Sequence, residues 1–162
     1  MRIIFTRNSS ILSWAIRWTF REPSSHVALV FDEDRWLVQS NLLGVNIRLF
    51  EPFMKKSGNE IVDSIEYSLT LDQEEELFQA LLKRTSEQSY DWPGFAYFIF
   101  RGILYRMFGR PLPKKNAWGR ADMQICTEMI REFPSWLVPG IDGVDLGITT
   151  PWTVRNILRG AK

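Results

Sequence analysis

The chain contains a single cysteine, Cys126, and a single histidine, His26. A thiol reacts as its thiolate, and a neighbouring imidazole can take up the proton that the thiol loses. Together with the positive end of a helix dipole, the imidazole lowers a thiol pKa from roughly 8.5 into the range of about 3.5–7.5. Cys126 lies near the start of a predicted helix in QICTEMI, and His26 opens a predicted strand in SSHVALVF. If the fold brings the two residues together, the sequence predicts a nucleophilic Cys–His pair.

An imidazole that acts as a base needs a polar neighbour that fixes its tautomer. Gln39 lies near the end of the next predicted strand, Arg35–Ser40. If the two strands pair as a hairpin, Gln39 and His26 become cross-strand neighbours. A slip in register would instead place Ser40 or Asn41 beside the ring.

Both residues also have structural explanations. Cys126 shares a helix face with Met129, Ile130 and Phe133, which suits a small core residue. His26 fits the end of a strand with one satisfied hydrogen bond. One Cys and one His are too few soft ligands for an ordinary structural zinc site, and we expect neither a metal nor a cofactor.

The elements that must position these residues follow from hydrophobic periodicity, with strands early in the chain and helices late. The predicted strands are Arg2–Thr6, His26–Phe31, Arg35–Ser40, Val45–Phe50 and Ser64–Leu69. The predicted helices cover about 11–20, about 70–88, Trp92–Met107, Asp122–Phe133 and Pro151–Leu158. This order predicts a single α+β domain over residues 1–162, an antiparallel sheet packed against helices.

Charge is balanced overall, with 20 Lys and Arg against 19 Asp and Glu, but its distribution is uneven. No acidic residue lies between Trp92 and Ala121, a segment that holds Arg101, Arg106, Arg110, Lys114, Lys115 and Arg120. This block suits either an anionic partner, such as lipid headgroups, a cell-wall polymer or nucleic acid, or a solvated surface.

No targeting or membrane-spanning segment is predicted. The apolar run Ile3–Phe5 stops at Thr6, far short of a signal-peptide core, and Phe95–Phe100 is cut by Arg101. We therefore expect a cytoplasmic protein.

The order and spacing of these motifs resemble the circularly permuted NlpC-type papain-like proteins, which include the YiiX-like hydrolases and, more distantly, lecithin:retinol acyltransferase. In unpermuted members the cysteine helix precedes the histidine strand, whereas here that order is reversed. The segments that carry the resemblance are ILSWAIRW, SHVALV, YDWPG, QICTEMI and TPWTVRNIL.

The resemblance implies Cys126 as nucleophile, His26 as general base and Gln39 as orienting residue. It implies a hydrolase or acyltransferase acting on an amide, ester or thioester, with a peptide, cell-wall or lipid-like acyl substrate and a bacterial or phage origin. The backbone N–H of Cys126 is the expected oxyanion donor, and Glu128 matches the CxE pattern without a catalytic role.

The predicted aromatic helix, which carries Phe95, Tyr97, Phe98 and Tyr105, and the basic loop after it suit one wall of the substrate cleft. The helical spacing of these aromatic residues equally suits a place in the core. We expect Tyr90, Trp92 and Arg101 to contact the substrate. Two other functions stay open: a catalytically silent binding domain with this fold, and a peripheral binder of anionic membrane or nucleic acid through residues 101–120.

Overall fold

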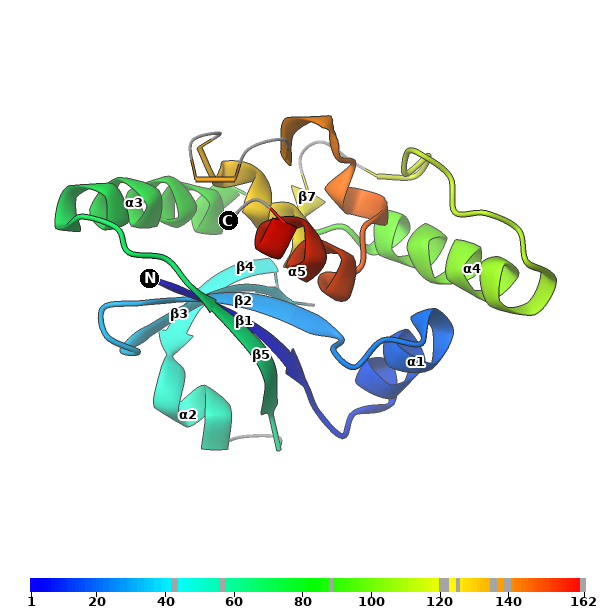
Figure 1. The fold of residues 1–162 in the computed structure, drawn as a ribbon, viewed down its shortest axis with the longest axis horizontal. Helices are drawn as coiled ribbons and strands as arrows, with labels where there is room; N and C mark the ends of the chain where they lie inside the picture. Colours follow the sequence, from blue (N-terminus) through cyan, green and yellow to red (C-terminus); the bar gives the residue numbers. More distant parts are fainter. Residues whose placement is uncertain are drawn as a thin grey trace.

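A five-stranded antiparallel sheet lies at the centre of the computed structural model (Figure 1). The structure describes residues 1–41, 44–55, 58–87, 89–119, 123–124, 126–134, 137–138 and 141–160. The strand order is β4-β3-β2-β1-β5, and each neighbouring pair is antiparallel. The strands are β1 (Arg2–Arg7), β2 (His26–Phe31), β3 (Trp36–Asn41), β4 (Gly44–Leu49) and β5 (Glu60–Glu66). The expected α+β class, with an antiparallel sheet and helices, is confirmed.

Helices and a small second sheet complete the described chain. The α-helices are α1 (Ile11–Phe20), α2 (Phe50–Lys55), α3 (Leu71–Glu87), α4 (Trp92–Phe108) and α5 (Pro151–Gly160). The 3₁₀-helices are η1 (Cys126–Glu132), η2 (Ile141–Gly143) and η3 (Leu146–Ile148). Two short parallel strands, β6 (Ser89–Tyr90) and β7 (Met123–Gln124), form the second sheet.

Three predicted elements differ from the structure. The predicted strand Ser64–Leu69 is found earlier, as β5, because Glu60 to Glu66 pair along β1 through a bulge between Phe5 and Thr6. The predicted strand over Val45–Phe50 ends at Leu49, and α2 begins at Phe50. The helix predicted from Asp122 is a 3₁₀-helix that starts at Cys126, and Asp122 itself lies outside the described residues.

Alternating side chains give the sheet two apolar faces. On one face, Phe5 and Leu29 join the main core with residues of α3, α5 and η1. On the other face, Ile4 and Leu37 form a smaller cluster covered by Phe53 of α2. By the same alternation, His26 lies on the α2 face while its neighbour Val27 enters the main core. His26 is the first residue of β2, so its side chain lies at the edge of the sheet rather than within the apolar cluster on either face.

Helices α1 and α4 pack closely against one another, and Gly102 of α4 permits that approach (Figure 1). A Cβ atom at Gly102 would lie 2.5 Å from both Phe20 Cζ and Thr19 Cγ2. We predict that Gly102→Ala lowers the free energy of unfolding by about 1–3 kcal/mol, because a tight helix contact must open. Urea unfolding measures the change. Gly160→Ala is the matched control, because nothing lies within 4 Å of a Cβ there, and an equal loss in both variants would contradict the prediction.

Candidate active site

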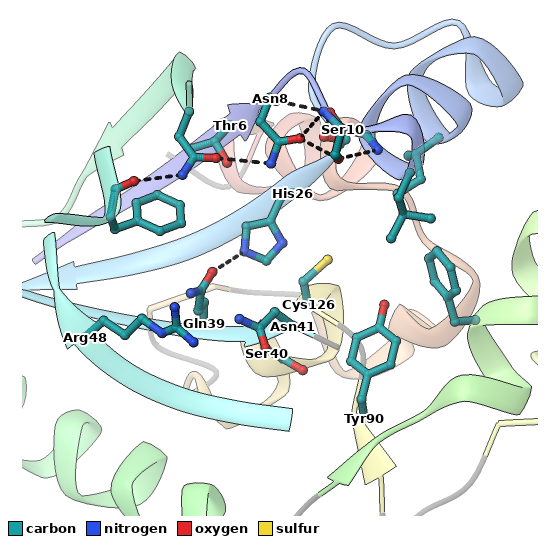
Figure 2. A pocket seen from close by; sticks show the side chains of 17 residues that line it. Thr6, Asn8, Ser10, His26, Gln39, Ser40, Asn41, Arg48, Tyr90 and Cys126 are labelled. Carbon is teal, nitrogen blue, oxygen red and sulfur yellow. Dashed lines mark hydrogen bonds between the residues drawn. The ribbon is translucent and has the colours of Figure 1, made fainter. Parts of the chain in front are cut away.

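A cavity of about 510 Å³ opens where β2, β3, α1 and η1 meet (Figure 2). His26, Gln39 and Cys126 all line it, although Cys126 is far from the other two in sequence. The fold therefore brings the chain's single cysteine and single histidine to one solvent-reachable space.

The His26 ring is held by Gln39. Nε2 of His26 lies 2.9 Å from Oε1 of Gln39, and Gln39 is buried. A carbonyl oxygen only accepts, so Nε2 carries the hydrogen and the lone pair of the neutral ring is left on Nδ1. The paired part of β2 and β3 ends at Leu29 opposite Val38, so Gln39 reaches the ring diagonally across the hairpin.

A further set of hydrogen bonds orients the Gln39 amide. Gln39 Nε2 donates to Asn46 Oδ1 at 3.4 Å, and Arg48 Nε donates to the same oxygen at 3.0 Å. Asn46 Nδ2 donates to the carbonyl of Gly44 at 2.9 Å. These contacts turn the oxygen of Asn46 towards the Gln39 amide nitrogen, and so turn the oxygen of Gln39 towards His26. Asn46 and Arg48 are residues that sequence reasoning missed.

The Cys126 side chain faces the other side of the ring. Figure 2 shows the Cys126 side chain beside the His26 ring, with Gln39 on the opposite side of the ring. Cys126 is the first residue of η1, and the backbone N–H groups of Val27, Thr127 and Cys126 itself are directed at its sulfur. The contact with Val27 fixes the sulfur beside the residue that follows His26.

Burial controls the pKa values of both groups. Burial raises the pKa of the Cys126 thiol to about 11, against the effect of the N–H groups around the sulfur. Burial lowers the pKa of His26 to about 4, and the hydrogen bond to Gln39 opposes that shift. The expected lowering of the thiol pKa is therefore wrong for the resting pair, which is a neutral thiol beside a neutral imidazole at pH 7. Desolvation outweighs the short 3₁₀-helix dipole and the N–H groups.

Transfer of the Cys126 proton to His26 has a different energetic cost from its release to water. A lone thiolate or a lone imidazolium would leave one uncompensated charge in the cavity. Transfer from sulfur to Nδ1 creates two opposite charges that attract one another. In this cavity a thiolate and an imidazolium formed together therefore cost less free energy than either charge formed alone.

The lowered pKa of His26 predicts a loss of stability in acid. The unfolded chain binds a proton at His26 near pH 6.5, whereas the folded chain binds it only near pH 4. Between these values the unfolded state holds more protons, so the free energy of unfolding falls as the pH falls. Urea unfolding at pH 7, 5.5 and 4.5 measures this slope, and we expect a shallower slope in His26→Asn. Parallel slopes in the two proteins would contradict the assignment.

The cavity has two chemically different halves. Figure 2 shows Arg48 on the Gln39 side of the ring and Tyr90 on the Cys126 side. The polar half is lined by Thr6, Asn8, Ser10, Arg48 and Asn59, and the apolar half by Leu12, Ile16, Tyr90 and Phe95. Among the described lining residues, Arg48 is the one Lys, Arg, Asp or Glu side chain.

Tyr90 directs its hydroxyl group into the cavity towards Cys126 (Figure 2). Burial raises the pKa of Tyr90, and nearby Cys126, Asp91 and Glu128 raise it further. Its hydroxyl therefore stays protonated and can donate a hydrogen bond to negative charge that develops beside the sulfur.

The other predicted site residues lie in different places. Ser40 and Asn41 line the cavity, but Gln39 makes the hydrogen bond to the ring. Trp92 is half exposed and packs edge-on against Tyr90, outside the described cavity lining. Arg101 donates to the carbonyl of Pro111 at 3.1 Å and also lies outside that lining. The structure therefore gathers Cys126, His26, Gln39 and Tyr90, but not the other two predicted substrate contacts.

Residues after Cys126 anchor the start of η1. Thr127 Oγ1 donates to the carbonyl of Leu146 at 2.8 Å. Glu128 is buried and forms an ion pair with Arg131 at 3.3 Å. Both contacts fix η1 rather than enter the cavity. Among the described residues, no three His, Cys, Asp or Glu side chains gather closely enough to hold a metal ion.

Comparison with known proteins identifies no relative of this chain. No protein-family model, curated protein or solved structure matches this chain.

Proposed function

We propose that this chain is a thiol-dependent hydrolase or acyltransferase of permuted papain-like architecture that forms an acyl-enzyme on Cys126. One observation carries the proposal: Cys126 and His26 line the same cavity, and Gln39 holds the ring so that its basic nitrogen is free. The chain order, with the His26 strand before the Cys126 helix on an antiparallel sheet, supports the permuted architecture.

The first half of the reaction forms the thioester. The proton of Cys126 passes to Nδ1 of His26 as Sγ attacks the carbonyl carbon of an amide, ester or thioester, and a C–S bond forms. The carbonyl oxygen becomes an oxyanion, which the backbone N–H of Cys126 and the Tyr90 hydroxyl stabilise. The intermediate then collapses, the bond to the leaving group breaks, and His26 gives that group its proton.

The second half releases the acyl group. His26 takes a proton from water, or from an alcohol, amine or thiol acceptor, as its oxygen, nitrogen or sulfur attacks the thioester carbon. The C–S bond breaks and Cys126 regains its proton from His26. Acid–base help of about 10²–10⁴-fold and oxyanion stabilisation of about 10²–10³-fold are usual magnitudes for such groups.

The two halves of the cavity favour a substrate with two parts. Leu12, Ile16 and Phe95 suit an apolar acyl group, and Arg48 with the surrounding amides and hydroxyls suits a polar or anionic leaving part. We therefore favour a lipid-like acyl substrate over a highly charged peptide.

The test is direct capture of the acyl-enzyme. The protein is mixed with p-nitrophenyl butyrate, quenched in acid and weighed intact by mass spectrometry. We expect one butyryl group on Cys126, removable by hydroxylamine, and a burst of p-nitrophenol equal to the enzyme concentration. An adduct on other residues, or none with this ester and with matched amide and thioester substrates, would contradict the proposal.

A second candidate is a catalytically silent binding domain that uses the same cavity. The raised pKa of the Cys126 thiol favours it, because such a thiol is weakly reactive alone. A silent domain would bind an acyl ligand equally well before and after Cys126→Ala and would form no adduct.

Gln39 supplies a positioning test of the proposed reaction. We predict that Gln39→Leu lowers kcat/KM by about 10²-fold, because the His26 ring loses its fixed direction. Gln39→Glu keeps the acceptor oxygen and adds negative charge, so it raises the pKa of His26 and moves the acidic limb of the pH–rate profile to higher pH. If the acidic limb of the pH–rate profile does not move in Gln39→Glu, residue 39 does not act through the His26 ring.

A further inference from the structure

Helix α1 carries large apolar side chains on its outer face as well as its inner face. Ile11, Trp14 and Trp18 recur at the i, i+3, i+7 spacing of one helix face, and all three are exposed. Ile11 is 85% exposed, and the rings of Trp14 and Trp18 stack at 6.1 Å between centroids. The opposite face, with Ser13 and Ile16, is already buried against the protein. The outer face is therefore not needed for the core.

The exposed face continues onto α4. The guanidinium of Arg106 lies 4.1 Å from the ring centroid of Trp18 and donates to the Trp18 carbonyl. The next two residues, Met107 and Phe108, are 63% and 67% exposed at the end of α4. Figure 1 shows α1 and α4 at the same end of the molecule. We define the α1/α4 surface as Ile11, Trp14, Trp18, Arg106, Met107 and Phe108.

The two chain segments that carry this surface hold basic residues and no acidic ones. Neither residues 1–21 nor residues 92–121 contain an Asp or Glu residue. Together they hold 10 of the chain's 20 Lys and Arg residues, and the remaining segments hold all 19 Asp and Glu residues. Arg106 contacts an aromatic ring and a carbonyl rather than a carboxylate, so its charge is available to an anionic partner.

We propose that the α1/α4 surface docks on an anionic lipid bilayer. Tryptophan is favoured at the boundary between headgroups and acyl chains, and basic residues are attracted to anionic headgroups. The aliphatic side chains of Ile11 and Met107 suit acyl chains and offer nothing to stacked bases, which favours lipid over nucleic acid. Among the described residues, no helix is long and apolar enough to cross a membrane.

This contact is separate from catalysis but has a consequence for it. Leu12 and Ile16 project from the other side of α1 and line the apolar half of the cavity. A docked α1 therefore holds the cavity beside the bilayer. The docking itself needs neither Cys126 nor His26, so its test does not depend on the proposed function.

Co-sedimentation with vesicles tests the proposal, using the full chain carrying Cys126→Ala. We expect binding to vesicles of phosphatidylcholine mixed with phosphatidylglycerol, weaker binding to phosphatidylcholine alone, and release by salt. The pair Trp14→Ser with Trp18→Ser should weaken binding by tenfold or more. Leu71→Ser is the matched control, because Leu71 is 88% exposed on α3 and lies outside the α1/α4 surface.

A charge change tests the other half of the surface. Arg106→Glu should weaken binding by about fivefold or more, whereas Arg35→Glu, an exposed arginine on the β2–β3 hairpin, should change it less. Quenching of tryptophan fluorescence by brominated lipid is measured on the protein with an unchanged α1/α4 surface. This readout therefore does not depend on whether a surface variant folds. Absent quenching, equal losses in the control variants, or binding to duplex DNA but not to vesicles would overturn the proposal.

Discussion

Replacing Cys126 with alanine is expected to abolish the acyl-enzyme and to lower kcat/KM for an ester substrate by about 10⁴-fold or more. The chain has no second thiol, so no other cysteine can take over. The hydroxyl groups along the cavity are weak nucleophiles without the His26 contact. Burst kinetics and intact mass after an acid quench measure both effects.

The companion variant Cys126→Ser separates chemistry from packing. Serine keeps the size of the side chain but has a much higher pKa, so activity should stay lost while the urea unfolding midpoint stays close to that of the unchanged protein. Full activity in either variant would contradict the assignment of Cys126 as nucleophile. So would a butyryl adduct that forms on another residue as fast as the adduct forms in the unchanged protein.

Replacing His26 with alanine is expected to lower kcat/KM by about 10³–10⁴-fold while leaving the thiol in place. Nδ1 no longer receives the proton, so attack would require a lone thiolate, which burial disfavours by raising the pKa of Cys126 to about 11. Residual activity should therefore keep rising into alkaline solution, unlike that of the unchanged protein.

Added imidazole gives this variant a specific readout. The alanine leaves space at the cavity wall for a free imidazole molecule, which should restore part of the activity in His26→Ala but not in Cys126→Ala. Loss of activity that imidazole does not restore, in a variant that also unfolds at lower urea, would indicate that His26 has only a structural role.

The strands that carry His26 and Gln39 could be predicted because local sequence dominates there. SHVALV is a short apolar run that ends in the acidic turn Asp32–Asp34, and the hairpin brings the two strands together. The structure bears this out with β2 at His26–Phe31 and a hydrogen bond between His26 and Gln39. Cys126 lies a hundred residues further along the chain, and its place in the same cavity rests on tertiary packing, which no local pattern reveals.

Other parts of the site could not be predicted for the same reason. Asn46 matters because β4 places it beside Gln39, and nothing in VNIRL marks one polar residue above another. The pKa of Cys126 depends on how much solvent the folded chain excludes, and the pattern of residues around it does not give that quantity. The sequence analysis places Trp92 among the substrate contacts, but its ring is half exposed and packs edge-on against Tyr90, outside the described cavity lining.

The central claim is that Cys126 passes its proton to His26, and the pH dependence of thiol alkylation tests it most directly. Iodoacetamide labelling of Cys126, followed by intact mass, should accelerate in the unchanged protein as His26 loses its proton above about pH 4 and should level off near neutral pH. In His26→Ala the rate should stay low at neutral pH and climb towards about pH 11. Superimposable profiles for the two proteins would contradict the account.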